Sequence, residues 1–124
     1  MQYLFVFLGA GTGGVLRFIT SKLVHDLLSD WFLPMGTFAV NMIGCFLIGF
    51  FAHLAESHSF MTPEVRLFLL VGLLGGFTTF STFGFDLFSL IQDGKLIWAI
   101  ANAVVQVVLG ILLVYLGYWL GKFV

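Results

Sequence analysis

Charged residues are scarce in this chain. Its 124 residues include five Lys and Arg and six Asp and Glu, whereas 60% are hydrophobic. A soluble domain carries about 25% charged residues, mostly on its surface. The low charge therefore excludes an ordinary soluble domain, and the mean hydropathy of +1.12 predicts an all-α integral membrane protein.

Cysteine is nearly absent, and this excludes several kinds of site. Cys45 is the single cysteine, so an intrachain disulfide and a cysteine metal cluster are both impossible. His25, His53 and His58 are not spaced three or four residues apart, as a helical metal-binding pair requires. The sequence also lacks a phosphate-binding loop and a nucleophile paired with a base, so we do not expect an enzyme.

Long uncharged stretches account for most of the chain. A helix needs about 20 apolar residues to cross a hydrocarbon core of about 30 Å. We expect a single transmembrane domain over residues 1–124, with four spans at about 1–22, 31–55, 65–91 and 96–121. The short connections leave no room for a soluble domain.

The distribution of basic residues does not fix an orientation in the membrane. With four spans, one side carries three basic residues, Arg17, Lys22 and Lys95, and the other carries two, Arg66 and Lys122. This bias is too small for the positive-inside rule to decide. We therefore expect insertion in both directions and an antiparallel homodimer, in which two copies act as an inverted repeat does within one longer transporter.

Polar residues form stripes on two of the expected spans. Thr37, Asn41 and Cys45 recur every four residues on the second span, and Asn102 and Gln106 do so on the fourth. An unpaired amide or hydroxyl in hydrocarbon is costly, so each stripe must face a partner or water. Hydrogen bonds between helices and a polar pathway both remain open as explanations.

The segment "GLLGGFTTFSTFGFD" at residues 72–86 is unusual for a membrane helix. Three glycines in five residues are followed by four hydroxyl residues in five positions, Thr78, Thr79, Ser81 and Thr82. This composition favours a broken helix. Non-helical backbone at membrane depth occurs only where protein buries it or where it lines a cavity. We therefore expect the break to lie at an interface or a pathway.

Two half-helices that meet in the membrane would offer two kinds of ion site. Carbonyl groups at the end of the first half, around Gly75 and Thr78, can hold a small cation. Hydroxyl groups of Thr79 or Ser81 can cap the second half and face an anion.

Phenylalanines crowd the same segment. Phe80 and Phe83 are three residues apart and share one face of the second half-helix. Packing against lipid or core is the usual role of such side chains. The electropositive ring edge can also meet an anion weakly, and a pore needs weak sites that release the ion.

Three segments together resemble a known family. They are "GGVLRF" at 13–18, "GTFAVNMIGCFLIG" at 36–49 and "GGFTTFSTF" at 75–83. They are similar to the signature segments of the small bacterial fluoride channels, the Fluc or CrcB family, and the similarity extends over essentially the whole chain. The resemblance implies an antiparallel, dual-topology homodimer in the bacterial inner membrane, with two pathways for passive export of fluoride.

The resemblance also implies roles for individual residues. Phe80 and Phe83 would face fluoride, and Asn41 would be the pore-lining amide. Main-chain oxygens of Gly75 and Thr78 would bind a structural sodium ion at the dimer centre. Arg17 would lie in an aqueous vestibule, and the polar neighbours of the pore would be Thr37, Ser81 and Thr82.

Two other functions fit a short four-span chain. A proton-coupled exporter of the small multidrug resistance kind needs a carboxylate within the first span, and residues 1–22 contain none. Asp86, near the end of the third span, is available as a proton site, although an interfacial role is the simpler explanation. A subunit that only packs against a partner would leave the polar stripes and the broken helix without a purpose.

Overall fold

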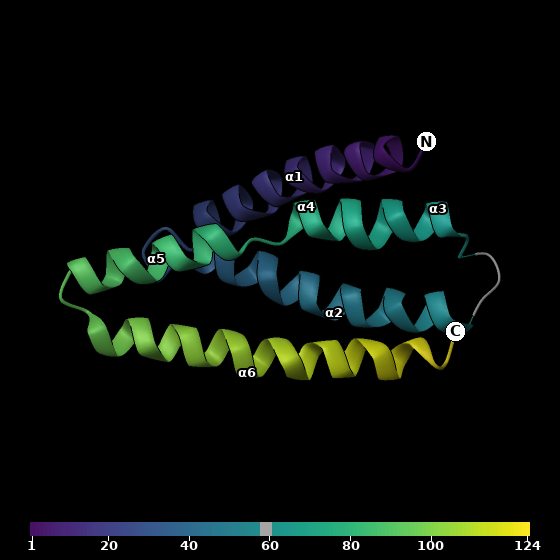
Figure 1. Ribbon diagram of the computed structural model, residues 1–124. Coiled ribbons are helices and arrows are strands. Elements are labelled where there is room, and N and C mark those ends of the chain that lie inside the picture. Colours follow the sequence, from purple (N-terminus) through teal and green to yellow (C-terminus); the bar gives the residue numbers. More distant parts are fainter. Residues whose placement is uncertain (58–60) are drawn as a thin grey trace.

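The fold is a bundle of long helices. The computed structural model describes residues 1–57 and 61–124, so His58, considered above with the other histidines, lies outside the described residues. The elements in chain order are α1 (Gln2–Leu27), α2 (Met35–Ser57), α3 (Pro63–Arg66), η1 (Leu67–Leu74), α4 (Gly75–Phe77), α5 (Phe80–Gln92) and α6 (Leu96–Gly121) (Figure 1). Four segments are long and apolar enough to cross a membrane: α1, α2, α3 through α5 together, and α6. The prediction of an all-helical, four-span membrane protein is confirmed.

Two helix ends differ from the predicted spans. Helix α1 continues beyond residue 22 to Leu27, and so includes a charged final turn that the uncharged pattern did not cover. Helix α2 begins at Met35 instead of residue 31. Pro34 explains this later start, because proline disfavours helical geometry in the residue before it but fits well at a helix beginning.

The four spans pack as two pairs that lie side by side. Helix α1 lies along η1 and α4, and α2 lies along α6 (Figure 1). Helix α5 continues the third span toward the end where α6 begins, and it packs against α6. Both chain termini lie at the opposite end of the bundle (Figure 1).

Glycines allow both pairs to approach at backbone distance. A Cβ atom added to Gly9 would lie 2.9 Å from the Cα of Gly72, and one added to Gly117 would lie 3.0 Å from the backbone nitrogen of Phe50. Side chains at these positions would force the helices apart. The small residues therefore serve packing within the chain, as they do in other membrane helix pairs.

The first half of the third span is a π-helix. It extends over the eight residues of η1, whereas most π-helical geometry in proteins is limited to a single turn and is frequent at functional sites. No sequence pattern predicted it. The wide helix leads directly into α4 and the break that follows.

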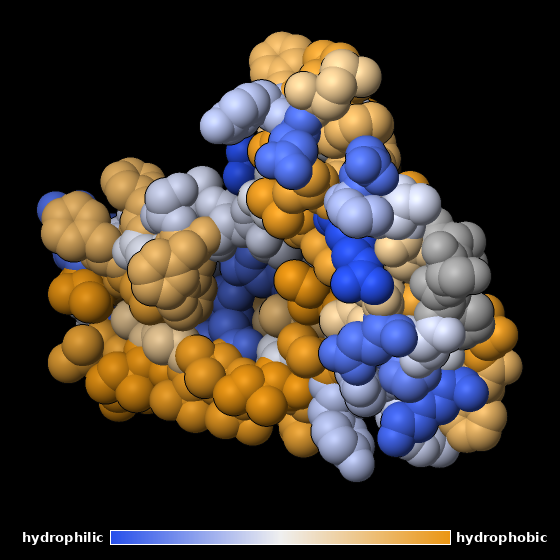
Figure 2. Space-filling model, turned by 45° about the vertical axis from the view of Figure 1, so that its right-hand side comes forward, coloured by the Kyte–Doolittle hydropathy of each residue, from blue (hydrophilic) through white to orange (hydrophobic). Residues whose placement is uncertain are grey.

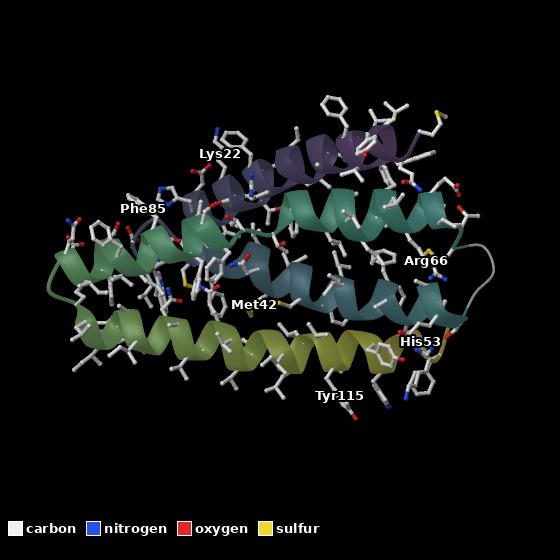
Figure 3. The ribbon with its side chains drawn as sticks, viewed as in Figure 1. Lys22, Met42, His53, Arg66, Phe85 and Tyr115 are labelled. Atoms are coloured by element: carbon white, nitrogen blue, oxygen red, sulfur yellow. The ribbon has the colours of Figure 1, made fainter. Side chains whose placement is uncertain are left out.

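Arg66 of α3 is hydrogen-bonded to the end of α2. Its Nη2 atom donates to the carbonyl of Ala55 at the end of α2, and its Nε atom donates to the carbonyl of Met61 at 3.1 Å. Ala55 and Met61 are buried in one hydrophobic cluster. Figure 3 shows Arg66 and His53 of α2 at this same end of the bundle.

Candidate functional site

The third span is interrupted at two residues. Thr78 (φ −79°, ψ 161°) and Thr79 (φ −151°, ψ 123°) are extended, and α5 begins at the next residue. The Thr79 hydroxyl caps α5 by accepting a hydrogen bond from the backbone nitrogen of Thr82 at 3.3 Å. The Thr82 hydroxyl donates to the same oxygen at 2.9 Å. Of the two candidates that the sequence offered, Thr79 or Ser81, the N-cap is therefore Thr79.

Asn41 of α2 holds the break in place. Its Oδ1 atom accepts from the backbone nitrogen of Thr79 at 3.0 Å, and its Nδ2 atom donates to the carbonyl of Thr79 at 3.1 Å. Nδ2 also donates to Oε1 of Gln106, on α6, at 3.1 Å. A side-chain amide has two N–H groups, so both hydrogens of Asn41 are bonded to the protein.

The carbonyl groups of Gly75 and Thr78 are not bonded as they would be in a continuous helix. In a continued helix, the backbone nitrogen of Thr79 would donate to the carbonyl of Gly75. It donates to Asn41 instead, and this releases the Gly75 carbonyl from its helical partner. The carbonyl of Thr78 accepts from Nη1 of Arg17 at 3.4 Å, which brings a positive charge from α1 to the break.

A cavity of about 340 Å³ lies beside the break. Asn41, Gln106, Phe80 and Phe83 are among the residues that line it. The ring centroids of Phe80 and Phe83 are 5.7 Å apart, so both rings are on the face of α5 that the spacing predicted. Figure 2 shows a recess with hydrophilic residues at its bottom and hydrophobic residues around it.

The cavity also has an apolar wall, formed by α2 and α6. Met42 is 8% exposed and lines the cavity. Figure 3 shows its side chain between α2 and α6, where Gly110 of α6 leaves room for it. The polar groups of the cavity are therefore few and lie near Asn41 and the break.

A second cavity, of about 250 Å³, adjoins the same break. Arg17, Thr37, Thr79 and Thr82 contribute polar groups to its wall. Thr79 lines both cavities. The second cavity therefore combines a guanidinium group with hydroxyl groups, which is a suitable surface for attracting an anion.

The structure brings most of the predicted site residues together. Asn41, Phe80 and Phe83 line the first cavity, and Arg17, Thr37 and Thr82 line the second. Gly75 and Thr78 precede and form the break. Ser81 is exposed, and its hydroxyl lies 3.4 Å from that of Thr79.

Gln106, in the polar stripe on α6, lies against Asn41 of α2. Gln106 is 6% exposed and accepts from Asn41, while its Nε2 atom donates to Oδ1 of Asn102 at 3.2 Å. The sequence left the direction of this stripe open. Its spacing indicated that Asn102 and Gln106 share a face, but pairing with Asn41 could not be read from it.

Asp86 and the described histidines are not among the residues that line either cavity. Asp86 is half-buried on α5, and its Oδ2 atom has no hydrogen-bond partner within residues 1–57 and 61–124. Within the same residues, no group of three His, Cys, Asp or Glu side chains is close enough to hold a metal ion.

Comparison with known proteins identifies the family of this chain. Residues 4–118 match the family described as CrcB-like protein, Camphor Resistance (CrcB). The chain is 43% identical over 121 residues to a protein of Methylobacillus flagellatus, and the match covers 98% of this chain and 94% of the relative. It is 43% identical over 118 residues to a protein of Aquifex aeolicus, with 94% of each chain covered.

A third relative, from Phocaeicola vulgatus, is 44% identical over 119 residues, and the match covers 96% of this chain and 97% of the relative. All three relatives carry the name "Fluoride-specific ion channel FluC". A family match over nearly the whole length, together with this level of identity, establishes that the chain belongs to the CrcB-like family.

Proposed function

We propose that this protein is a fluoride channel that allows passive export of fluoride across the bacterial inner membrane. The observation that carries the proposal is the broken third span, where Asn41, Phe80 and Phe83 line one cavity and Arg17 lines the adjoining one. Relatives named as fluoride-specific channels support the same function.

The chemistry of the two cavities suits a small anion. Arg17 and the hydroxyl groups attract an anion to the second cavity. Fluoride holds its water strongly, so a pore must replace those hydrogen bonds with donors from the protein. Amide and hydroxyl donors are strong replacements, whereas the ring edges of Phe80 and Phe83 are weak ones. Such weak sites allow the ion to leave.

The surface of one chain supports a homodimer. Phe80 is 81% exposed although it follows the break directly. A Cβ atom added to Gly75 or Gly84 would meet no atom within 4 Å in the described part of the chain. The space beside Gly75 is therefore open to contact with a second copy. A second copy, inserted in the opposite direction, would cover this face and provide a second pathway by symmetry.

A sodium ion at the dimer centre is part of the same proposal. Carbonyl oxygens are the hard ligands that such a cation prefers, and Gly75 has a carbonyl without its helical partner. The Thr78 carbonyl accepts from Arg17 but has a second lone pair. Two carbonyls from each copy would complete the site, so the sodium ion would stabilise the dimer and not take part in fluoride transfer.

The alternative exporter has less support. Helix α1 carries its one carboxylate, Asp26, in its final turn, away from the middle of the membrane. A proton-coupled exporter needs an acid at membrane depth that exchanges with its cationic cargo. Asp86 is the remaining candidate, and it lies outside both cavities described above.

Fluoride efflux from liposomes that contain the purified protein tests the function. We expect rapid, voltage-driven efflux from wild type and its loss in Phe80→Ile and Asn41→Asp. Phe85→Ile is the matched control, because Phe85 is a 67% exposed phenylalanine of the same helix on the side opposite Phe83. Chloride efflux as fast as fluoride efflux, or dye uptake driven by a proton gradient, would contradict the proposal.

A further inference from the structure

Three side-chain amides form a continuous chain from α2 to α6. Asn41 donates to Gln106 at 3.1 Å, and Gln106 donates to Asn102 at 3.2 Å. Gln106 is 6% exposed, and it is the one buried polar residue in the described part of the chain. A buried amide is retained only when its hydrogen bonds are made, so the position of Gln106 depends on both neighbours.

The backbone fixes the direction of this chain. The backbone nitrogen of Thr79 can only donate, so Oδ1 of Asn41 must face it and Nδ2 must face α6. Gln106 must then present its oxygen to Asn41 and its nitrogen to Asn102. The orientation of each amide therefore follows from the helix break.

The hydrogens of Asn41 are not free to bind an incoming anion. Fluoride can only accept hydrogen bonds, and both hydrogens of Asn41 are already taken by the Thr79 carbonyl and by Gln106. An anion that binds the amide of Asn41 must displace one of them. The bond to Thr79 belongs to a two-point attachment that holds the break, whereas the bond to Gln106 is single and lies in the cavity wall.

Taking fluoride conduction as argued above, we propose that Gln106 is a positioning residue that competes with fluoride for the amide of Asn41. Its Oε1 atom accepts the hydrogen bond from Asn41 when the ion is absent, and fluoride accepts that bond in its place when the ion arrives. The exchange of one acceptor for another keeps the binding of fluoride weak. Weak binding allows the ion to leave, which conduction requires.

The concentration dependence of fluoride efflux tests this role. The substitution Gln106→Met removes the competing oxygen at similar volume, so one hydrogen of Asn41 becomes available to fluoride. We expect the half-saturating fluoride concentration to fall about fivefold, which corresponds to one neutral hydrogen bond. The substitution Gln106→Glu supplies a stronger acceptor, and we expect the half-saturating concentration to rise about tenfold, because hydrogen bonds to charged groups are stronger.

The two substitutions change the half-saturating concentration in opposite directions, so Gln106→Glu remains a test if Gln106→Met does not fold. Val108→Met is the control, because Val108 lies two residues further along α6 and on its other side. An increase in the half-saturating concentration with Gln106→Met would overturn the proposal, because it would indicate that Gln106 itself donates to fluoride. An unchanged value would also overturn it. Absence of fluoride efflux from wild type would instead refute the channel function.

Discussion

Helix α1 meets the third span without side chains between them, and the substitution Gly13→Ala tests this contact. A Cβ atom at Gly13 would lie 2.8 Å from the backbone nitrogen of Phe77 and still closer to the carbonyl oxygen of Leu73. Real Cβ atoms essentially never approach closer than 3.0 Å. Both obstacles are backbone atoms, so no side chain can rotate away and the two helices must separate.

The cost of Gly13→Ala follows from two opposing effects. Overpacking costs about 1–3 kcal/mol, and the better helix propensity of alanine returns about 1 kcal/mol. We expect a net loss of stability of up to about 2 kcal/mol. The separation would also move Arg17, one turn further along α1, away from the Thr78 carbonyl, which it reaches at 3.4 Å. Fluoride efflux should therefore decrease as well.

Thermal unfolding in detergent and fluoride efflux from liposomes measure the two effects. Gly11→Ala is the control, because Gly11 lies on the same helix and an added Cβ would meet nothing within 4 Å in the described residues. We expect a lower Tm for Gly13→Ala and not for Gly11→Ala. Equal Tm values and equal efflux for the two variants would refute the packing that the structure places at Gly13.

Three further substitutions test other contacts. Arg66→Met removes the hydrogen bonds to the carbonyls of Ala55 and Met61, so we expect a lower Tm in detergent, and an unchanged Tm would contradict a stabilising role of these bonds. Thr79→Val removes the cap of α5 and should cost about 0.5–2 kcal/mol in thermal unfolding, whereas Thr79→Ser should keep most of it. Arg17→Gln removes the charge of the second cavity, so fluoride efflux should slow and lose much of its salt dependence. Efflux as fast as that of wild type at low salt would refute the role of this charge.

Much of the fold follows from local sequence patterns. Apolar length and scarce charge predicted four spans because the cost of burying charge in a bilayer applies to every residue separately. The break was also predictable, since glycines and hydroxyl residues at 75–82 weaken one helix and cap the next. The shared face of Phe80 and Phe83 followed from helical spacing alone.

Features that depend on distant residues could not be predicted in the same way. Asn41 and Gln106 are 65 positions apart, and no periodicity within α2 or α6 specifies that they meet. The π-helix of η1 has an ordinary apolar sequence, "LFLLVGLL". Nor could the sequence indicate that Arg17 reaches the Thr78 carbonyl, because this contact depends on how α1 packs against η1 and α4.

The polar residues near the break already hydrogen-bond to the backbone when no ion is bound. Free N–H and C=O groups at membrane depth are costly, and Asn41 satisfies both groups of Thr79. Asn41→Asp would replace the donor by a charge and would also remove the hydrogen bond to the Thr79 carbonyl. Loss of fluoride efflux in that variant therefore has two causes. Phe80 is 81% exposed and has an apolar side chain, so Phe80→Ile tests the effect of a ring edge on the anion without removing a hydrogen bond.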